Sequence, residues 1–250
     1  MATIALMTRD SRGPLALAGG NEFNPGNEAA DGLLVRAAGS LGAGRPAFVI
    51  ATAAARQGPD SAVEHAREWF AGLGLDVVEL PLRRRGQAND WRIAELASQG
   101  RFFYLCGGDP GIVPTTLRGT RAWDAILQAW RGGAALAGSS AGAMALGEWT
   151  LVRARMPGDS QRQARGALGV VPGVAVLPHF ETFGHRWVQS AREAVPERAV
   201  LVGIDERTAA IWQAGAWLGT GPGSVTFIAG GRERRFGPGE RIEGLPVPIE

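Results

Sequence analysis

The segment GSSAG, from Gly138 to Gly142, fits the pattern G-x-S-x-G and could carry a nucleophilic serine. In this pattern a strand turns sharply into a helix and presents the hydroxyl of the central residue, here Ser140. Small residues are needed on both sides because a larger side chain would prevent the turn from closing. Apolar residues before and after the turn suit a buried strand and a helix, so we predict Ser140 as the nucleophile and Ser139 as a bystander.

A serine hydroxyl needs a base to accept its proton, and the chain offers His65, His179 and His185. His65 lies in the middle of a helical segment among charged residues, which favours a solvent-facing role. His179 follows the apolar run VAVL, and the carboxyl ends of parallel strands are where catalytic groups gather in open sheets. We therefore predict His179 as the base and keep His185, at the expected start of a helix, as the second choice.

The base in turn needs a carboxylate that orients its ring and stabilises its charged form. Asp205 and Glu206 follow directly after the apolar segment AVLVGI. We prefer Glu206, and Asp205 stays open as the alternative. The resulting order of nucleophile, base and acid differs from that of α/β-hydrolases, in which the acid precedes the histidine, so an ordinary esterase is disfavoured.

Short apolar segments alternate with longer segments of helical period along the whole chain, which predicts strand-helix-strand units. We expect an α/β fold: a three-layer sandwich with a mainly parallel central sheet and helices on both faces. The C-terminal part is rich in strand formers separated by turns, and we expect extra β-hairpins there that extend the same sheet. No linker or repeat divides the chain, so we predict a single domain over residues 1–250.

The composition excludes several kinds of chemistry. All 26 basic residues are arginine, so mechanisms that need a lysine amine, such as a Ser-Lys dyad, a Schiff base or a Walker A loop, are ruled out. The formal net charge is only +2, and we interpret the arginine clusters at 83–85 and 231–235 as solvated loops, with no nucleic-acid partner. Cys106 is the single cysteine, which leaves no disulfide and no cysteine-rich metal site, and we interpret it as a small core residue.

The N-terminal residues lack the basic region and long apolar stretch of an export signal, and no segment reaches the length of a membrane span. We therefore expect a cytoplasmic protein without membrane contacts, and we expect neither a metal nor an organic cofactor. A homodimer that pairs through the C-terminal hairpins stays open, because the sequence does not decide whether those strands are covered.

Five segments resemble, in the same order, a family of serine peptidases that includes cyanophycinase and dipeptidase E, also called aspartyl dipeptidase: LALAGGNEF, YLCGGDPG, GSSAGAMAL, LPHF and GIDERTA. The resemblance implies a fold like that of class I glutamine amidotransferases, with serine at the turn where those enzymes carry cysteine. It implies a triad, an oxyanion hole of two backbone N–H groups and a substrate pocket. The triad is Ser140, His179 and Glu206. The oxyanion hole is formed by Gly108 and Ala141, and the pocket by Gly107 and Asp109.

Members of this family cleave peptide or isopeptide bonds beside aspartyl groups, so the resemblance implies a small aspartyl-containing peptide as the substrate. A carboxylate calls for a cation, which in this chain must be arginine; the candidates are Arg118, Arg153, Arg155 and Arg162. Pro110 follows Asp109 where cyanophycinases commonly carry glutamine, which argues against cyanophycin itself. An amidotransferase-like amidase and a catalytically silent binding protein of the same fold stay open as alternatives.

Overall fold

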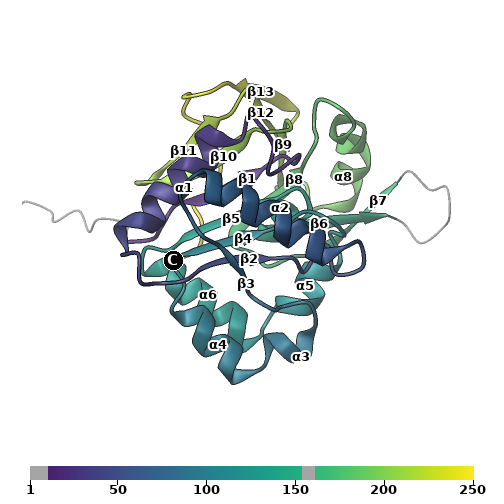
Figure 1. The fold of residues 1–250 in the computed structure, drawn as a ribbon. Helices are drawn as coiled ribbons and strands as arrows, with labels where there is room; N and C mark the ends of the chain where they lie inside the picture. The colour runs from purple at the N-terminus through teal and green to yellow at the C-terminus, as the bar shows by residue number, and fades with distance from the viewer. Residues whose placement is uncertain (1–10, 154–160) are drawn as a thin grey trace, which may run out of the picture.

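The computed structural model describes residues 11–153 and 161–250, whose strands form two sheets flanked by helices (Figure 1). The first sheet has the strand order β11-β10-β1-β5-β4-β2-β3. Its strands β1 to β5 run parallel, and the hairpin of β10 and β11 joins the edge antiparallel to β1. The bounds are β1 (Leu15–Ala18), β2 (Ala47–Ile50), β3 (Val78–Glu79), β4 (Phe102–Leu105), β5 (Ala135–Ser139), β10 (Ala209–Gln213) and β11 (Ala216–Thr220).

The second sheet has the strand order β13-β12-β9-β8-β6-β7. Here β6, β8 and β9 run parallel, while β7 and β12 pair antiparallel at the two sides and β13 completes a hairpin with β12. The bounds are β6 (Gly147–Arg153), β7 (Arg162–Gly166), β8 (Val171–Leu177), β9 (Val200–Ile204), β12 (Val225–Ala229) and β13 (Arg232–Phe236).

Most of the helices are short, and most of them cover the two faces of the first sheet, whereas the last helix packs against β7 and β9 of the second sheet. Within the described residues, no helix is both long enough and apolar enough to cross a membrane. Their bounds are α1 (Glu28–Ser40), α2 (Pro59–Gly72), α3 (Arg85–Ala88), α4 (Trp91–Ser98), α5 (Ile112–Leu117), α6 (Arg121–Arg131), α7 (Ala141–Leu146), η1 (Gly184–Trp187, a 3₁₀ helix) and α8 (Val188–Ala194).

The strand β4 shows why the first sheet is buried on both faces. Phe102 and Tyr104 pack with residues of α1 and α2, which cross one face of the sheet (Figure 1). Phe103 and Leu105 point the other way, into a core that α6 and the second sheet share. Because successive strand residues face opposite sides, a strand with two covered faces is apolar throughout, and all four residues of β4 are buried.

The expected α/β architecture with parallel strands at its centre is confirmed, but the C-terminal hairpins differ from expectation. They do not all extend one sheet: β10 and β11 join the first sheet, whereas β12 and β13 join the second. The short helix α7 explains why a second sheet begins at β6. A parallel crossover within one sheet needs roughly a dozen residues, whereas α7 supplies six before the chain enters β6 directly and starts the second sheet.

Candidate functional site

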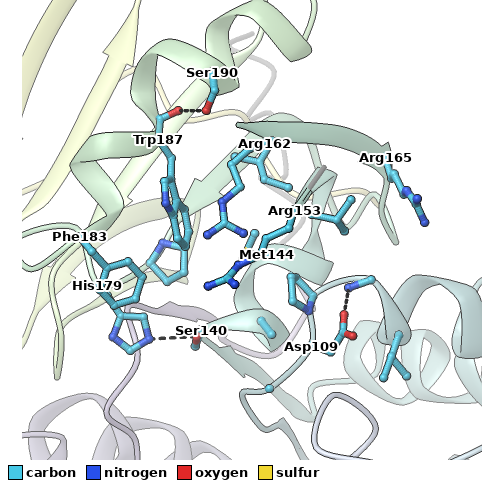
Figure 2. Close-up of a pocket in the computed structure, with 18 of the residues that line it drawn as sticks. Asp109, Ser140, Met144, Arg153, Arg162, Arg165, His179, Phe183, Trp187 and Ser190 are labelled. Atoms are coloured by element: carbon cyan, nitrogen blue, oxygen red, sulfur yellow. Dashed lines mark hydrogen bonds between the residues drawn. The ribbon is translucent and has the colours of Figure 1, made fainter. Parts of the chain in front are cut away.

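Side chains and backbone groups from both sheets meet where the parallel strands end. The turns after β1, β4 and β5 of the first sheet contribute Gly20, Gly108 and Ser140. The ends of β8 and β9 in the second sheet contribute His179 and Glu206. Figure 2 shows the open cleft beside these groups, with Ser140 and His179 at its base.

The turn around Ser140 has the strained geometry that its sequence pattern predicts. Ser140 has φ 49° and ψ −113°, a backbone conformation that costs a non-glycine residue free energy. A Cβ atom on Gly138 would lie 2.5 Å from the carbonyl carbon of Gly142, and a Cβ atom on Gly142 would collide with the carbonyl oxygen of Leu105. Both glycines are therefore required by contacts, and α7 begins directly after the serine.

Ser140, His179 and Glu206 form a continuous line of contacts. The Ser140 Oγ lies 3.1 Å from His179 Nε2, and His179 Nδ1 lies 2.7 Å from Glu206 Oε1. In the tautomer with the proton on Nδ1, the imidazole donates to the carboxylate and accepts from the serine hydroxyl. Asn21 Nδ2 donates to the other Glu206 oxygen at 3.1 Å, and the backbone N–H of Glu206 donates to the Glu181 carboxylate. This arrangement can remove a proton from Ser140 and stabilise the resulting imidazolium.

Backbone strain is concentrated around this line of contacts. Six non-glycine residues of the described chain have a positive φ, and four of them belong to the line or adjoin it. Ser140 and His179 are members, Asn21 contacts Glu206, and Arg207 follows Glu206 in the chain. Strained residues persist only where the surrounding structure fixes them, and they cluster at functional sites.

The imidazole of His179 is fixed by its neighbours on two sides. Gly20 lies against one side of the ring, where any Cβ atom would collide with the imidazole. Phe183 stacks on the ring with centroids 4.9 Å apart, and Trp187 continues the series with its centroid 5.2 Å from that of Phe183. Figure 2 shows these three rings along one wall of the cleft, below Ser190. We call His179, Phe183 and Trp187 the aromatic stack.

The other candidates for base and acid are engaged elsewhere. His185 is exposed, and its Nδ1 lies 3.0 Å from the carbonyl oxygen of Phe180, while His65 is exposed on α2. Asp205 is buried, and its Oδ2 accepts a hydrogen bond of 2.9 Å from the N–H of Ser224. Of the two neighbouring carboxylates, Glu206 is the one in contact with His179.

Two backbone N–H groups beside Ser140 have no protein acceptor among the described residues: those of Gly108 and Ala141. Both residues line the cleft together with Ser140. Gly108 has φ +141°, and a Cβ atom there would collide with the carbonyl oxygen of Ala53, so only glycine fits. Two such donors can stabilise negative charge on an oxygen bound next to the serine.

Of the two residues predicted to line the substrate pocket, Asp109 faces the cleft and Gly107 does not. Asp109 lines the cleft, and its Oδ1 accepts a hydrogen bond of 2.8 Å from the N–H of Gly111. Gly107 is not among the residues that line the cleft, and its N–H donates to Glu22 Oε1 at 2.8 Å. The sequence analysis missed Glu22, Asn21 and Gly20, although the glycine pair at the end of the first predicted strand was a usable signal.

The cleft is large and basic. Its volume of about 1810 Å³ exceeds the roughly 300–1,000 Å³ of pockets for single small molecules, which suits an extended ligand. Among the described residues, two acidic side chains line it, against five arginines: Arg56, Arg153, Arg162, Arg165 and Arg186. A ligand with negative charge is therefore favoured electrostatically.

Two of these arginines point toward the nucleophile. Figure 2 shows the guanidinium groups of Arg153 and Arg162 above Ser140, whereas Arg165 points away. The Arg162 guanidinium lies over the Trp187 ring at 3.7 Å from its centroid, and its buried Nε has no partner among the described residues. Burial and the charge of Arg153 both lower the pKa of Arg162.

The other arginine candidates and the single cysteine lie away from the cleft or outside the described residues. Arg118 donates to the carbonyl oxygen of Gly166 and does not line the cleft, and Arg155 lies outside the described residues. Cys106 is buried in the core, as predicted, and burial raises the pKa of its thiol, so it is unsuited to act as a thiolate nucleophile. Among the residues described, no three His, Cys, Asp or Glu side chains come together as ligands for a metal ion.

Comparisons with known proteins give a consistent result. The model of the family described as Peptidase family S51 matches residues 15–216. A cyanophycinase of Trichormus variabilis is 32% identical over 166 residues, which cover 64% of this chain and 55% of that protein. The chain thus spans about half the length of the curated relatives it matches.

Two solved structures extend the likeness to three dimensions. A peptidase from an acI-B1 actinobacterium has a TM-score of 0.80 and 28% identity, over 94% of this chain and 98% of that one. A putative peptidase E protein from Listeria monocytogenes EGD-e has a TM-score of 0.55 and 19% identity, over 93% of this chain and all of its own, and shows a shared fold alone.

Proposed function

Because the chain belongs to peptidase family S51, we propose that it is a serine peptidase that cleaves a peptide or isopeptide bond through an acyl-enzyme. The observation that carries this proposal is the pair of contacts from Ser140 to His179, 3.1 Å, and from His179 to Glu206, 2.7 Å. The likeness to the actinobacterial peptidase supports it over nearly the whole chain. A buried, protonated Cys106 argues against a thiol-dependent amidase.

In the proposed acylation step, the Ser140 oxygen attacks the carbonyl carbon of the scissile bond while its proton passes to His179 Nε2. Glu206 stabilises the imidazolium through Nδ1. The N–H groups of Gly108 and Ala141 donate to the carbonyl oxygen as it becomes negative, and each such donor contributes roughly 10²–10³ to kcat in related chemistry.

Collapse of this intermediate breaks the bond between carbon and nitrogen, and His179 donates its proton to the departing amine. The acyl part of the substrate is then bound to the Ser140 oxygen as an ester. Water attacks the ester with His179 as the base, the acid product leaves, and the serine regains its proton. The chain's own groups supply every proton transfer in this cycle.

For the substrate, we propose an aspartyl group whose carboxylate lies between Arg153 and Arg162. The two guanidinium groups face the cleft near Ser140 and repel each other unless an anion separates them. A carboxylate would supply that charge and accept hydrogen bonds from the terminal N–H groups of the two guanidinium groups. The family resemblance to cyanophycinases supports an aspartyl substrate in particular.

The test is a Ser140→Ala variant assayed on small aspartyl peptides, combined with labelling by a fluorophosphonate, a reagent that forms a bond to an activated serine oxygen. We expect the substitution to lower kcat by about four orders of magnitude or more and to remove the label. Ser61 is exposed on α2, and the Ser61→Ala variant serves as the control, which should keep both the wild-type kcat and the label. Turnover that survives in Ser140→Ala, or a label found on another residue by mass spectrometry, contradicts the proposal.

A further inference from the structure

Glu22 links the ends of three strands behind the nucleophile. It lies in the turn that follows β1, and its two carboxylate oxygens accept hydrogen bonds from two different strand ends. Oε1 accepts from the N–H of Gly107, after β4, at 2.8 Å. Oε2 accepts from the hydroxyl of Ser139, the last residue of β5, also at 2.8 Å. Since β5 lies between β1 and β4, the carboxylate spans the end of the strand that carries the nucleophile.

The contact with Gly107 controls one of the two free N–H groups of the cleft. The Gly107 N–H and the Gly108 N–H belong to two successive planar peptide units, so once the first unit is held, only the rotations at Gly107 can turn the Gly108 N–H. Space around Gly107 is also limited: a Cβ atom there would lie 2.8 Å from Glu22 Oε1 and 3.3 Å from Ser140 Cβ. The contact with Glu22 therefore limits the movement of the Gly108 N–H relative to the serine.

The contact with Ser139 controls the nucleophile itself. Ser139 is fully buried and immediately precedes Ser140, whose φ of 49° is strained. A strained residue relaxes unless its neighbours are held. Hydrogen bonds to a carboxylate are about twice as strong as those between neutral groups, so Glu22 is a suitable anchor.

We propose that Glu22 is a positioning residue, which holds the Gly108 N–H and the Ser140 oxygen in a fixed relation by binding Gly107 and Ser139 with one carboxylate. This inference rests on the proposed function. Glu22 does not line the cleft, so it acts through its partners and not on the substrate. Ser139 accordingly has a role of its own, as the hydroxyl through which β5 is anchored.

The experiment compares Glu22→Ala with Glu22→Gln in the full chain. We expect Glu22→Ala to lower kcat and the rate of fluorophosphonate labelling by roughly 100-fold, as for loss of one oxyanion donor, with KM within about threefold. Glu22→Gln should recover most of both rates, since its amide oxygen can accept from Gly107 and its amide nitrogen can donate to the Ser139 oxygen.

The matched control is Glu28→Ala, because the Glu28 carboxylate also accepts a hydrogen bond within this turn, from the N–H of Gly26, but contacts neither strand end. It should react like the wild type. Labelling of Glu22→Ala at the wild-type rate overturns the inference and leaves the proposed function intact.

A measurement that does not depend on activity separates the two proposals. Hydrogen exchange at the Gly107 N–H should be at least about tenfold faster in Glu22→Ala than in the wild type and in Glu28→Ala, because the amide has lost its acceptor. If the wild type takes up no fluorophosphonate, the proposed function is wrong, and hydrogen exchange at the Gly107 N–H alone then tests the positioning role of Glu22. Unchanged exchange in Glu22→Ala then overturns the positioning role.

Discussion

At the edge of the first sheet the site consists mostly of backbone groups around one reactive side chain, that of Ser140, whereas at the edge of the second sheet it consists of side chains. The first edge supplies N–H groups and a strained turn, and its glycines at 107, 108, 138 and 142 leave no room for a methyl group. The second edge supplies the imidazole of His179, the carboxylate of Glu206 and the guanidinium of Arg162. Apart from Ser140 and its anchor Glu22, the first half should therefore fail when an atom is added, and the second half when a functional group is removed.

Among the variants that test this comparison, the largest effect is expected from removing the charge of Glu206 at the second edge. Glu206→Gln keeps the shape but leaves a neutral partner for His179, and we expect kcat to fall by about 10³–10⁴-fold. The control is Asp205→Asn, because Asp205 is the adjacent carboxylate and contacts Ser224 instead of the imidazole. Steady-state kinetics should assign the whole loss to Glu206; an equal loss in both variants would mean that the region acts through folding alone.

Adding one methyl group at the first edge should come next. Gly142→Ala brings a Cβ atom onto the carbonyl of Leu105, so the turn must shift. We expect unfolding in urea to show a loss of about 1–3 kcal/mol, and labelling of Ser140 to slow by roughly 100-fold because the nucleophile moves. Gly39→Ala, in α1 with open space around it, is the control and should keep the labelling rate. Wild-type labelling in Gly142→Ala would break the comparison.

A smaller effect is expected from Arg162→Gln. Loss of a charged hydrogen bond to the substrate carboxylate should lower kcat/KM for aspartyl peptides by about 10–100-fold. The corresponding asparaginyl peptides, which lack the charge, should be affected little. Arg232→Gln at the opposite edge strand of the second sheet, where Arg232 is exposed, is the matched control. Equal losses on charged and neutral peptides would exclude Arg162 from carboxylate recognition.

Outside both halves, a substitution should change stability and leave the rate alone. Asp31 on α1 is buried, and burial raises its pKa from 3.8 to about 7, although the Trp69 indole donates to it at 2.8 Å. The folded state thus keeps a proton that the unfolded state releases, so stability falls as pH rises from about 4 to 7. Asp31→Asn should remove up to about 4 kcal/mol of this fall, measured by urea unfolding across pH, with kcat unchanged. A pH profile of unfolding identical to that of the wild type would show that Asp31 ionises normally.

The sequence predicted the groups whose roles follow from local pattern. Ser140 lies in a motif of five residues, and His179 and Glu206 each follow an apolar strand, so their convergence could be anticipated from parallel topology. Glu22 and Asn21 could not be found this way, because their partners are 85 and 185 residues distant and the contacts depend on strand order. The second sheet was missed for a similar reason: strand-forming segments do not reveal which sheet they join.

The aromatic stack also fixes a length. It runs from His179 through Phe183 to Trp187, on which the Arg162 guanidinium rests, so the proton acceptor and the proposed carboxylate site belong to one rigid wall. The stack then sets the distance between the position of a substrate's charge and the position of its scissile bond. Glutamate differs from aspartate by one methylene, and a displacement of about 1 Å can cost 100-fold in rate. Discrimination between the two acidic residues would thus be set by the spacing of these rings rather than by any contact with the extra carbon.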